Sequence, residues 1–130
     1  MQFTREAASE AHAIIACADG AIRLREREFT HSLIVTRTAV IDDWRPPAVG
    51  LLTIDDFSAL LALSPEVVLL GTGMRQLMPP PELYAAFAAR RIGLEVMDNR
   101  AASRTYNLLL SEYREVAVAL ILEGSPAQVA

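Results

Sequence analysis

The sequence predicts a single α/β domain in which a mainly parallel sheet is covered by helices. After residue 66, apolar strand patterns alternate with helical patterns in the order β-α-β-α-β, which is typical of parallel sheets. The first half of the chain instead carries short apolar or alternating runs, which indicate β structure. The length of 130 residues suits one domain, and hydrophobic residues make up 52% of it, which is ample for a core.

The composition excludes several classes of function. A net charge of −4 does not fit a nucleic-acid reader with a basic surface. All 12 basic residues are arginine, so lysine nucleophiles and Schiff bases are excluded and every fixed positive charge is a guanidinium. The single cysteine, Cys17, excludes an internal disulfide. His12 and His31 lie far apart without partners at ligand spacing, so we expect no metal, and we expect no cofactor.

No segment indicates a membrane span or a targeting signal. The apolar runs are far shorter than the roughly 20 residues that cross a bilayer. Residues 1–13 lack the apolar core of a signal peptide and carry two glutamates, which a transit peptide avoids. We therefore expect a cytoplasmic domain spanning residues 1–130, with an ordered core over about residues 12–122 and flexible tails.

The N-terminal half divides into short strands. Residues 12–17 form an apolar run, and Asp19-Gly20 signals a hairpin turn before an alternating run over residues 21–28. Three arginines share one side of that second run, either as an anion-binding stripe or as a solvated face balanced by glutamates: Arg23, Arg25 and Arg27. The strands expected next cover residues 32–36 and 39–41.

A loop and a series of helices and strands follow. Two prolines and a glycine make residues 42–52 a loop, where Trp44 either anchors a partner or folds back over the core. Thr53 and Asp56 have the spacing of a capping box, so the carboxylates there start a helix rather than catalyse. The remaining expected elements are a strand at 66–71, a helix at 81–91, a strand at 93–98, a helix at 100–113 and a strand at 114–122.

The candidate site lies where two of these strands end. Ligands of open α/β sheets gather at the carboxyl ends of parallel strands, and two such ends are readable. Gly71-Thr72-Gly73 follows one strand and Asp98-Asn99-Arg100 follows the other. If the strands are neighbours, their loops line one crevice that suits an anion, with glycines, helix N-termini and guanidiniums. The candidate binding residues are Gly71, Thr72, Gly73, Arg75, Asp98, Arg104, Thr105 and Asn107.

A purely structural interpretation of the same residues remains open. The glycines then make a tight turn, Arg104 pairs with a carboxylate such as Asp98, and Asn107 bonds loop backbone. The glycine pattern lacks the third glycine of a dinucleotide fingerprint and the Gly-Lys-Ser/Thr of a phosphate-binding loop. Three consecutive prolines at residues 79–81 also remove N–H groups that a phosphate would use, so an ordinary nucleotide site is not expected.

Three segments together resemble the family catalogued as domain of unknown function 498. They are "LLGTGMRQLMPPPEL", "GLEVMDNRAASRTYNLLLSE" and "VAVALIL", and the resemblance covers about residues 12–122. It implies a three-layer domain with a mixed, mostly parallel sheet flanked by helices and an added N-terminal β segment. The eukaryotic members include an assembly factor of mitochondrial respiratory complex I (NADH:ubiquinone oxidoreductase). The resemblance therefore implies a role in protein interaction.

Three functional hypotheses follow. The first is a non-enzymatic domain that acts through protein contacts, with the two-loop crevice as an anion pocket or a partner surface. The second is a small enzyme acting on an anionic metabolite, with Asp98 as the acid–base candidate. The third is self-association as a homodimer through Trp44 with Tyr84 or Phe87.

Overall fold

The computed structural model describes residues 12–122, so the tails expected at both ends lie outside the described residues. The strands are β1 (Ala16–Ala18), β2 (Ala21–Arg23), β3 (Glu28–Phe29), β4 (Leu33–Thr36), β5 (Val40–Ile41), β6 (Val67–Gly71), β7 (Gly93–Met97) and β8 (Val116–Leu120). The helices are the 3₁₀ turns η1 (Val49–Leu51) and η2 (Ile54–Phe57), followed by α2 (Ser58–Leu61), α3 (Pro81–Ala89) and α4 (Asn99–Ser111).

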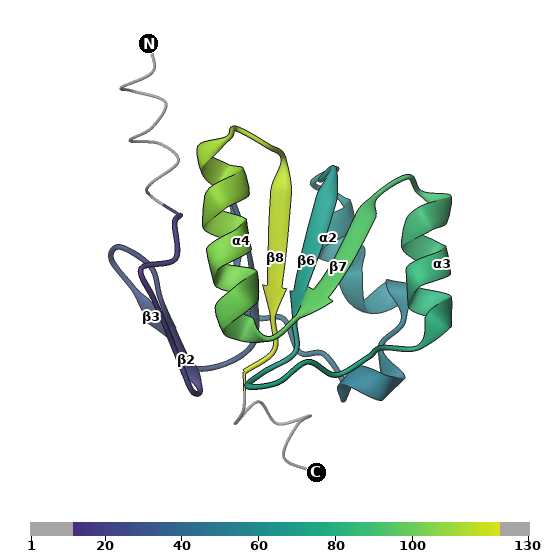
Figure 1. The fold of residues 1–130 in the computed structure, drawn as a ribbon, viewed down its shortest axis with the longest axis horizontal. Coiled ribbons are helices and arrows are strands. Elements are labelled where there is room, and N and C mark those ends of the chain that lie inside the picture. The colour runs from purple at the N-terminus through teal and green to yellow at the C-terminus, as the bar shows by residue number, and fades with distance from the viewer. Residues whose placement is uncertain (1–11, 123–130) are drawn as a thin grey trace.

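The central sheet has the strand order β5-β4-β8-β6-β7 (Figure 1). β6 pairs in parallel with both β7 and β8, but β4 is antiparallel to both β5 and β8. The prediction of a mainly, or mostly, parallel sheet is therefore wrong, because the sheet is mixed. β4 and β5 are separated by residues 37–39 alone, and so short a connection permits only a hairpin.

Each face of the sheet packs against its own layer. Val116, Val118 and Leu120 of β8 point to the face covered by α4, whereas Ala117 and Ala119 point to the face covered by α2 and α3. This alternation is the period of two that strands impose, and it produces two cores on opposite faces. Figure 1 shows α4 in front of the sheet and α2 behind it. The expected α/β domain, with a mixed sheet flanked by helices, is confirmed.

The N-terminal strands form a second sheet of their own. β1, β2 and β3 are antiparallel neighbours, and Ile22 and Phe29 bury their side chains in the core on the α4 side. The Asp19-Gly20 turn between β1 and β2 is confirmed, and Gly20 has a φ of 76° that favours glycine. The single strand expected over residues 21–28 is wrong, because the chain turns between Leu24 and Arg27.

That turn changes how the three N-terminal arginines are arranged on the surface. Arg23, Arg25 and Arg27 are all exposed, but they no longer follow one strand. Arg27 donates to Asp42 at 2.7 Å, and its guanidinium lies 4.5 Å from the centre of the Phe29 ring. The solvated-face interpretation therefore fits the geometry better than an anion-binding stripe.

The loop before the helices closes the second core. Trp44 is buried, lies 5.6 Å from Phe57 between ring centres and donates its indole N–H to the Asp56 carbonyl at 2.8 Å. It therefore folds back over the core rather than presenting itself to a partner. The capping box is confirmed, since the Thr53 and Asp56 side chains exchange bonds with each other's backbone at the start of η2.

Candidate functional site

The register of β6 and β7 brings the two predicted loops together. Gly71 is paired with Met97 at the last position of both strands, so both chains leave the sheet at the same edge. The Thr72 N–H continues the ladder by donating to the Met97 carbonyl at 3.0 Å. Gly71, Thr72, Gly73 and Asp98 therefore lie close together at the carboxyl edge of the parallel strands, as their sequence positions predict.

A buried asparagine joins the strand ends at this edge. Asn99 is only 7% exposed, and its backbone N–H donates to the Gly73 carbonyl at 2.8 Å. Its side-chain oxygen accepts the Gly73 N–H at 3.1 Å, while its side-chain nitrogen donates to the Ile121 carbonyl at 3.0 Å. One side chain thus satisfies backbone groups that follow β6 and β8, at the N-terminus of α4.

The two glycines make room for this arrangement. A Cβ at Gly71 would collide with the side-chain oxygen of Asn99 and would come within 2.7 Å of Leu120. Gly73 has a φ of 108°, a backbone conformation that other residues rarely adopt. The glycines therefore serve a turn that is closed by Asn99.

The next residues form a loop that its own polar groups hold in place. The Thr72 hydroxyl donates to the Arg75 carbonyl at 2.7 Å and accepts the Leu77 N–H at 3.0 Å. The Gln76 side chain donates to the Val96 carbonyl of β7 at 2.8 Å. A hydroxyl that serves two backbone groups at once is engaged by the loop itself. Thr72 therefore shapes the loop rather than offering a free donor.

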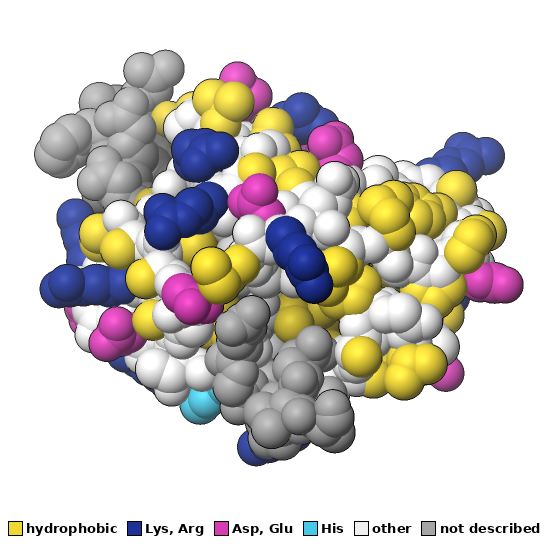
Figure 2. All heavy atoms as spheres, turned by 60° about the horizontal axis from the view of Figure 1, so that its bottom comes forward, with side chains coloured by type: hydrophobic (Ala, Val, Ile, Leu, Met, Phe, Trp, Pro, Cys, Tyr) yellow, Lys and Arg dark blue, Asp and Glu magenta, His cyan; other side chains and the backbone are white. Residues whose placement is uncertain are grey.

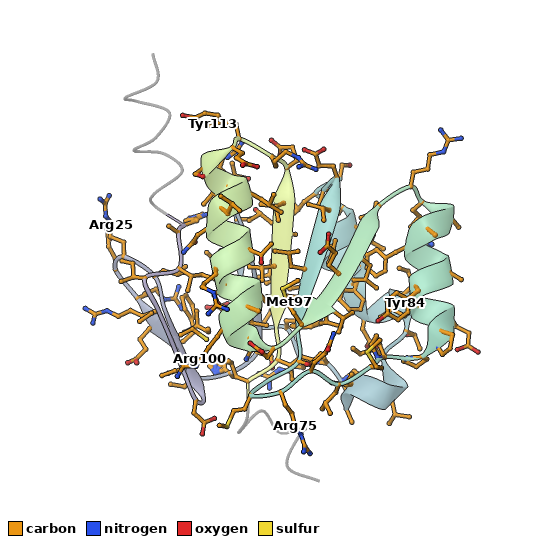
Figure 3. All side chains as sticks on the ribbon, in the orientation of Figure 1. Arg25, Arg75, Tyr84, Met97, Arg100 and Tyr113 are labelled. Atoms are coloured by element: carbon orange, nitrogen blue, oxygen red, sulfur yellow. The ribbon has the colours of Figure 1, made fainter. Side chains whose placement is uncertain are left out.

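This fixed loop presents apolar side chains to solvent. Met74 is 66% exposed, Leu77 40% and Met78 62%. Arg75 is exposed among them, and Figure 3 shows it pointing away from the sheet, below the strand ends. Figure 2, which turns this edge toward the viewer, shows apolar and basic side chains interspersed on the face. We call residues 74–78 the edge loop.

A small cleft lies beside the edge loop. It has a volume of about 70 Å³ and is lined by the hairpin turn of the N-terminal sheet, the start of the edge loop and the first turn of α4. Its lining residues are Cys17, Ala18, Asp19, Gly20, Gly73, Met74, Asp98, Asn99 and Arg100. A water molecule needs roughly 10–15 Å³ on this scale, so the cleft holds only a few waters or one small group.

The charges around the cleft do not favour an anion. Asp19 and Asp98 contribute two carboxylates, while Arg100 contributes one guanidinium. Asp98 is already used as the cap of α4, because its side chain accepts the Ala101 N–H at 2.9 Å. The positive end of the helix therefore meets a carboxylate of the chain itself.

The predicted residues further along α4 lie outside the cleft. Arg104 is exposed and Thr105 is half-buried, and neither lines the cleft. Asn107 forms two hydrogen bonds with the backbone of Ile14, accepting from its N–H at 2.9 Å and donating to its carbonyl at 2.8 Å. Asn107 therefore holds the segment before β1 against α4, as the structural interpretation anticipates.

A tyrosine one residue earlier supports the same segment. The Tyr106 side chain is fully buried, and its hydroxyl donates to the His12 carbonyl at 3.0 Å. Burial raises the pKa of this hydroxyl above its ordinary value, because the charged phenolate would lose its hydration. Tyr106 is thus a neutral donor that, with Asn107, fixes the N-terminal segment.

The sequence places Asn99 in the second loop but does not predict that its side chain joins the strand ends, nor that Gln76 contacts β7. An available signal is the Asp98-Asn99 pair directly after a strand, since both side chains can bond nearby backbone. Within residues 12–122, no group of three or more His, Cys, Asp or Glu side chains could hold a metal ion. In the same part of the chain, no helix combines the length and the apolar character that crossing a membrane requires.

The fold and the site define a small α/β domain whose carboxyl edge is closed by internal polar bonds and carries an exposed apolar loop. Residues 14–121 match the family described as "Protein of unknown function (DUF498/DUF598)", and the chain belongs to this family. The resemblance seen in the sequence is therefore confirmed.

Relatives and solved structures agree with this placement. The chain is 33% identical over 95 residues to the "13 kDa major membrane protein" of Francisella tularensis, covering 72% of this chain and 77% of that relative. It is 32% identical over 97 residues to the mouse protein "NADH dehydrogenase [ubiquinone] 1 alpha subcomplex assembly factor 3", covering 73% of this chain but only 51% of the mouse protein. An NMR structure from Xanthomonas campestris matches with a TM-score of 0.79 and 39% identity, covering 91% of this chain and 86% of the other.

Proposed function

We propose that the protein is a protein-interaction domain that binds its partner through the edge loop. The observation that carries this proposal is an apolar loop, exposed at Met74, Leu77 and Met78, that is held in place by hydrogen bonds. The Thr72 hydroxyl bonds the loop backbone, and the Gln76 side chain bonds the Val96 carbonyl of β7. Apolar side chains held in solvent by a defined backbone are typical of a binding surface rather than of a loop that has simply failed to pack.

The fixed backbone favours binding. A loop that is already ordered loses little conformational freedom when a partner docks, so more of the contact energy remains as affinity. Methionine side chains adapt to the shape of a partner, and burial of apolar surface contributes about 25 cal/mol per Å². The exposed guanidinium of Arg75 can pair with a carboxylate through two parallel hydrogen bonds. We therefore assign to Arg75 the recognition of an acidic side chain on the partner.

The relatives suggest the kind of partner. The mouse relative is named as an assembly factor of NADH dehydrogenase, and this chain spans about half of that protein's length. We infer that the partner is a protein subunit of a membrane-associated enzyme, recognised before or during its assembly. The cytoplasmic location stays a prediction, since the Francisella relative is named a membrane protein.

The other functional hypotheses have less support. A small-anion pocket in the cleft is disfavoured by the carboxylates of Asp19 and Asp98. The enzyme hypothesis relies on Asp98, whose carboxylate caps α4. A dimer face built on Trp44 with Tyr84 or Phe87 has little exposed surface, because Trp44 is 8% exposed, Phe87 is fully buried and Tyr84 is half-buried.

The test is partner capture with matched surface variants. The double variant Met74→Ser, Met78→Ser removes two exposed apolar side chains from the edge loop. The control variant Leu63→Ser, Leu108→Ser removes two exposed apolar side chains elsewhere on the surface. We expect the edge-loop variant to lose a partner first identified by crosslinking with the unmodified protein, by about tenfold in affinity or more, while the control retains it.

Two results would contradict the proposal. One is full retention of that partner by a folded edge-loop variant. The other is a saturable rise in melting temperature with phosphates, nucleotides or carboxylic acids, accompanied by turnover of the bound compound. A ligand at a hundred times its Kd adds about 2.7 kcal/mol of stability, so such binding would be readily detected.

A further inference from the structure

One edge of the central sheet has free backbone groups beside the edge loop. Among the described residues, β7 pairs only with β6, and it is the outermost strand on the side of α3 (Figure 1). The opposite edge strand, β5, is only two residues long, which leaves little ladder for another strand. β7 is five residues long. It is therefore the edge of this sheet with room for a further strand.

The hydrogen bonds at both ends of β7 show which residues face outward. Gly93 donates its N–H to Glu66 at 3.2 Å, and the Met97 carbonyl accepts from Thr72 at 3.0 Å, so both residues face β6. The backbone N–H and carbonyl groups of successive residues point alternately to the two sides of a strand. Those of Leu94 and Val96 therefore point away from β6, toward the open edge of the sheet.

Most of these outward groups have no partner. Within residues 12–122, the Leu94 N–H and carbonyl and the Val96 N–H make no hydrogen bond, whereas the Val96 carbonyl accepts from Gln76. A row of two free donors and one free acceptor is the template that an added strand completes. The Gln76 bond also places this edge directly beside the edge loop.

The side chains of β7 specify what the added strand must carry. Leu94 and Val96 are half-buried against the core on the α3 side. Glu95 lies between them on the opposite face and is exposed. A strand paired with this edge therefore needs apolar residues beside Leu94 and Val96, with a lysine or arginine between them beside Glu95.

The same charge argues against a second copy of this chain. Two copies of β7 that run antiparallel and use both outward residues must place Leu94 opposite Val96 of the other copy, and Glu95 opposite Glu95. Directly opposed side chains in a pair without hydrogen bonds approach closely, so two carboxylates there are destabilising. A basic strand from a different protein removes this repulsion.

We propose that β7 is a strand-addition site that receives an extended segment of the partner with the pattern apolar–basic–apolar. This inference rests on the proposed function, because it assigns the chemistry of the partner segment that docks next to the edge loop. Backbone bonds to Leu94 and Val96 supply the pairing, and the charge of Glu95 selects the register. The edge loop then contacts the residues that follow.

The direct test is NMR titration of the full chain, labelled with ¹⁵N, with capped synthetic octapeptides. One peptide carries a central Val-Lys-Val and its control a central Val-Glu-Val. We expect the lysine peptide to shift the amide signals of Leu94 and Val96 most strongly and the glutamate peptide to bind more weakly. Glu95→Lys should reverse this preference, whereas the matched charge change Glu112→Lys, at the exposed end of α4, should leave it unchanged.

A second variant tests the backbone pairing itself. Val96→Pro removes one outward N–H, and proline is tolerated on edge strands where that group faces solvent. A folded Val96→Pro protein should lose the peptide-induced shifts. Shifts centred on other elements, or a peptide preference that Glu95→Lys does not change, would overturn strand addition. If the edge-loop variant loses its protein partner while both peptides fail to bind, the proposed function stands and strand addition is rejected.

Discussion

Asn99 and Gly73 bond each other in both directions, with the Asn99 N–H 2.8 Å from the Gly73 carbonyl and the Gly73 N–H 3.1 Å from the Asn99 side-chain oxygen. This reciprocal pair locks the loop after β6 to the first turn of α4. The edge loop begins at the next residue, Met74. The position of the exposed apolar side chains is therefore set by a buried polar contact.

The first prediction is that Asn99→Ala destabilises the fold by about 2–4 kcal/mol, because it leaves the Gly73 N–H and the Ile121 carbonyl buried without partners. Urea denaturation measures this change. Arg100→Ala is the control, since Arg100 is exposed and its loss should cost less than about 0.5 kcal/mol. Equal effects of the two substitutions would show that Asn99 does not hold the edge together.

The second prediction compares two glycines. Gly71→Ala should destabilise the protein by about 1–3 kcal/mol, because its new methyl group meets Asn99 and Leu120 at overlapping distance. Gly50→Ala places a methyl group in open space, so its melting temperature should change little. A neutral Gly71→Ala would contradict the close packing of this edge.

The third prediction concerns the N-terminal segment. Asn107→Ala removes both hydrogen bonds to the Ile14 backbone, so the Ile14 amide should exchange with solvent much faster. Hydrogen exchange followed by NMR measures this, with Arg104→Ala as the exposed control on the same helix. Partner binding should persist in Asn107→Ala. Loss of partner binding in this variant would show that Asn107 belongs to the binding site after all.

The fourth prediction is a dependence of stability on pH near the other end of the sheet. Glu66 accepts the Glu115 N–H at 2.9 Å and the Arg114 guanidinium at 3.3 Å, and these bonds lower the pKa of its carboxyl in the folded state. A lowered folded pKa contributes stability that is present above the unfolded value, about 4.3, and is lost as the pH falls through the folded value.

Glu66→Gln should therefore weaken the decline in melting temperature between about pH 5 and pH 3. Glu112→Gln serves as control, because the Glu112 carboxylate makes no hydrogen bond within residues 12–122. The effect is expected to be small, since Glu66 is exposed and water screens its interactions. Identical pH profiles for both variants would contradict this assignment.

The second half of the fold was predictable because its signals are local. Alternating strand and helix patterns located β6, α3, β7, α4 and β8, and the Thr53–Asp56 spacing located η2. The antiparallel direction of β4 was not predictable, since β4 pairs with β8 across more than 80 residues of sequence, and no local pattern encodes that pairing. The turn at residues 24–27 contains no glycine, proline or asparagine, so no residue signals it and the alternating pattern predicts one continuous strand.

The candidate site was predictable only at the strand ends. Parallel neighbours end at one edge, so the positions of Gly71 and Asp98 followed from the strand pattern. Arg104 and Asn107 did not join them, because helix geometry separates them from Asn99. At 100° and 1.5 Å per residue, Arg104 lies roughly 140° around the axis from Asn99, and Asn107 lies roughly 12 Å further along it.

The proposed function requires the edge loop to contact a protein partner. The most direct measurement is photo-crosslinking with a photoreactive amino acid placed at Met78, compared with the same substitution at Leu108, an exposed apolar residue of α4. We predict a discrete crosslinked product with one partner protein from position 78 and none with that partner from position 108. Crosslinking to that partner from position 108 alone would contradict the claim.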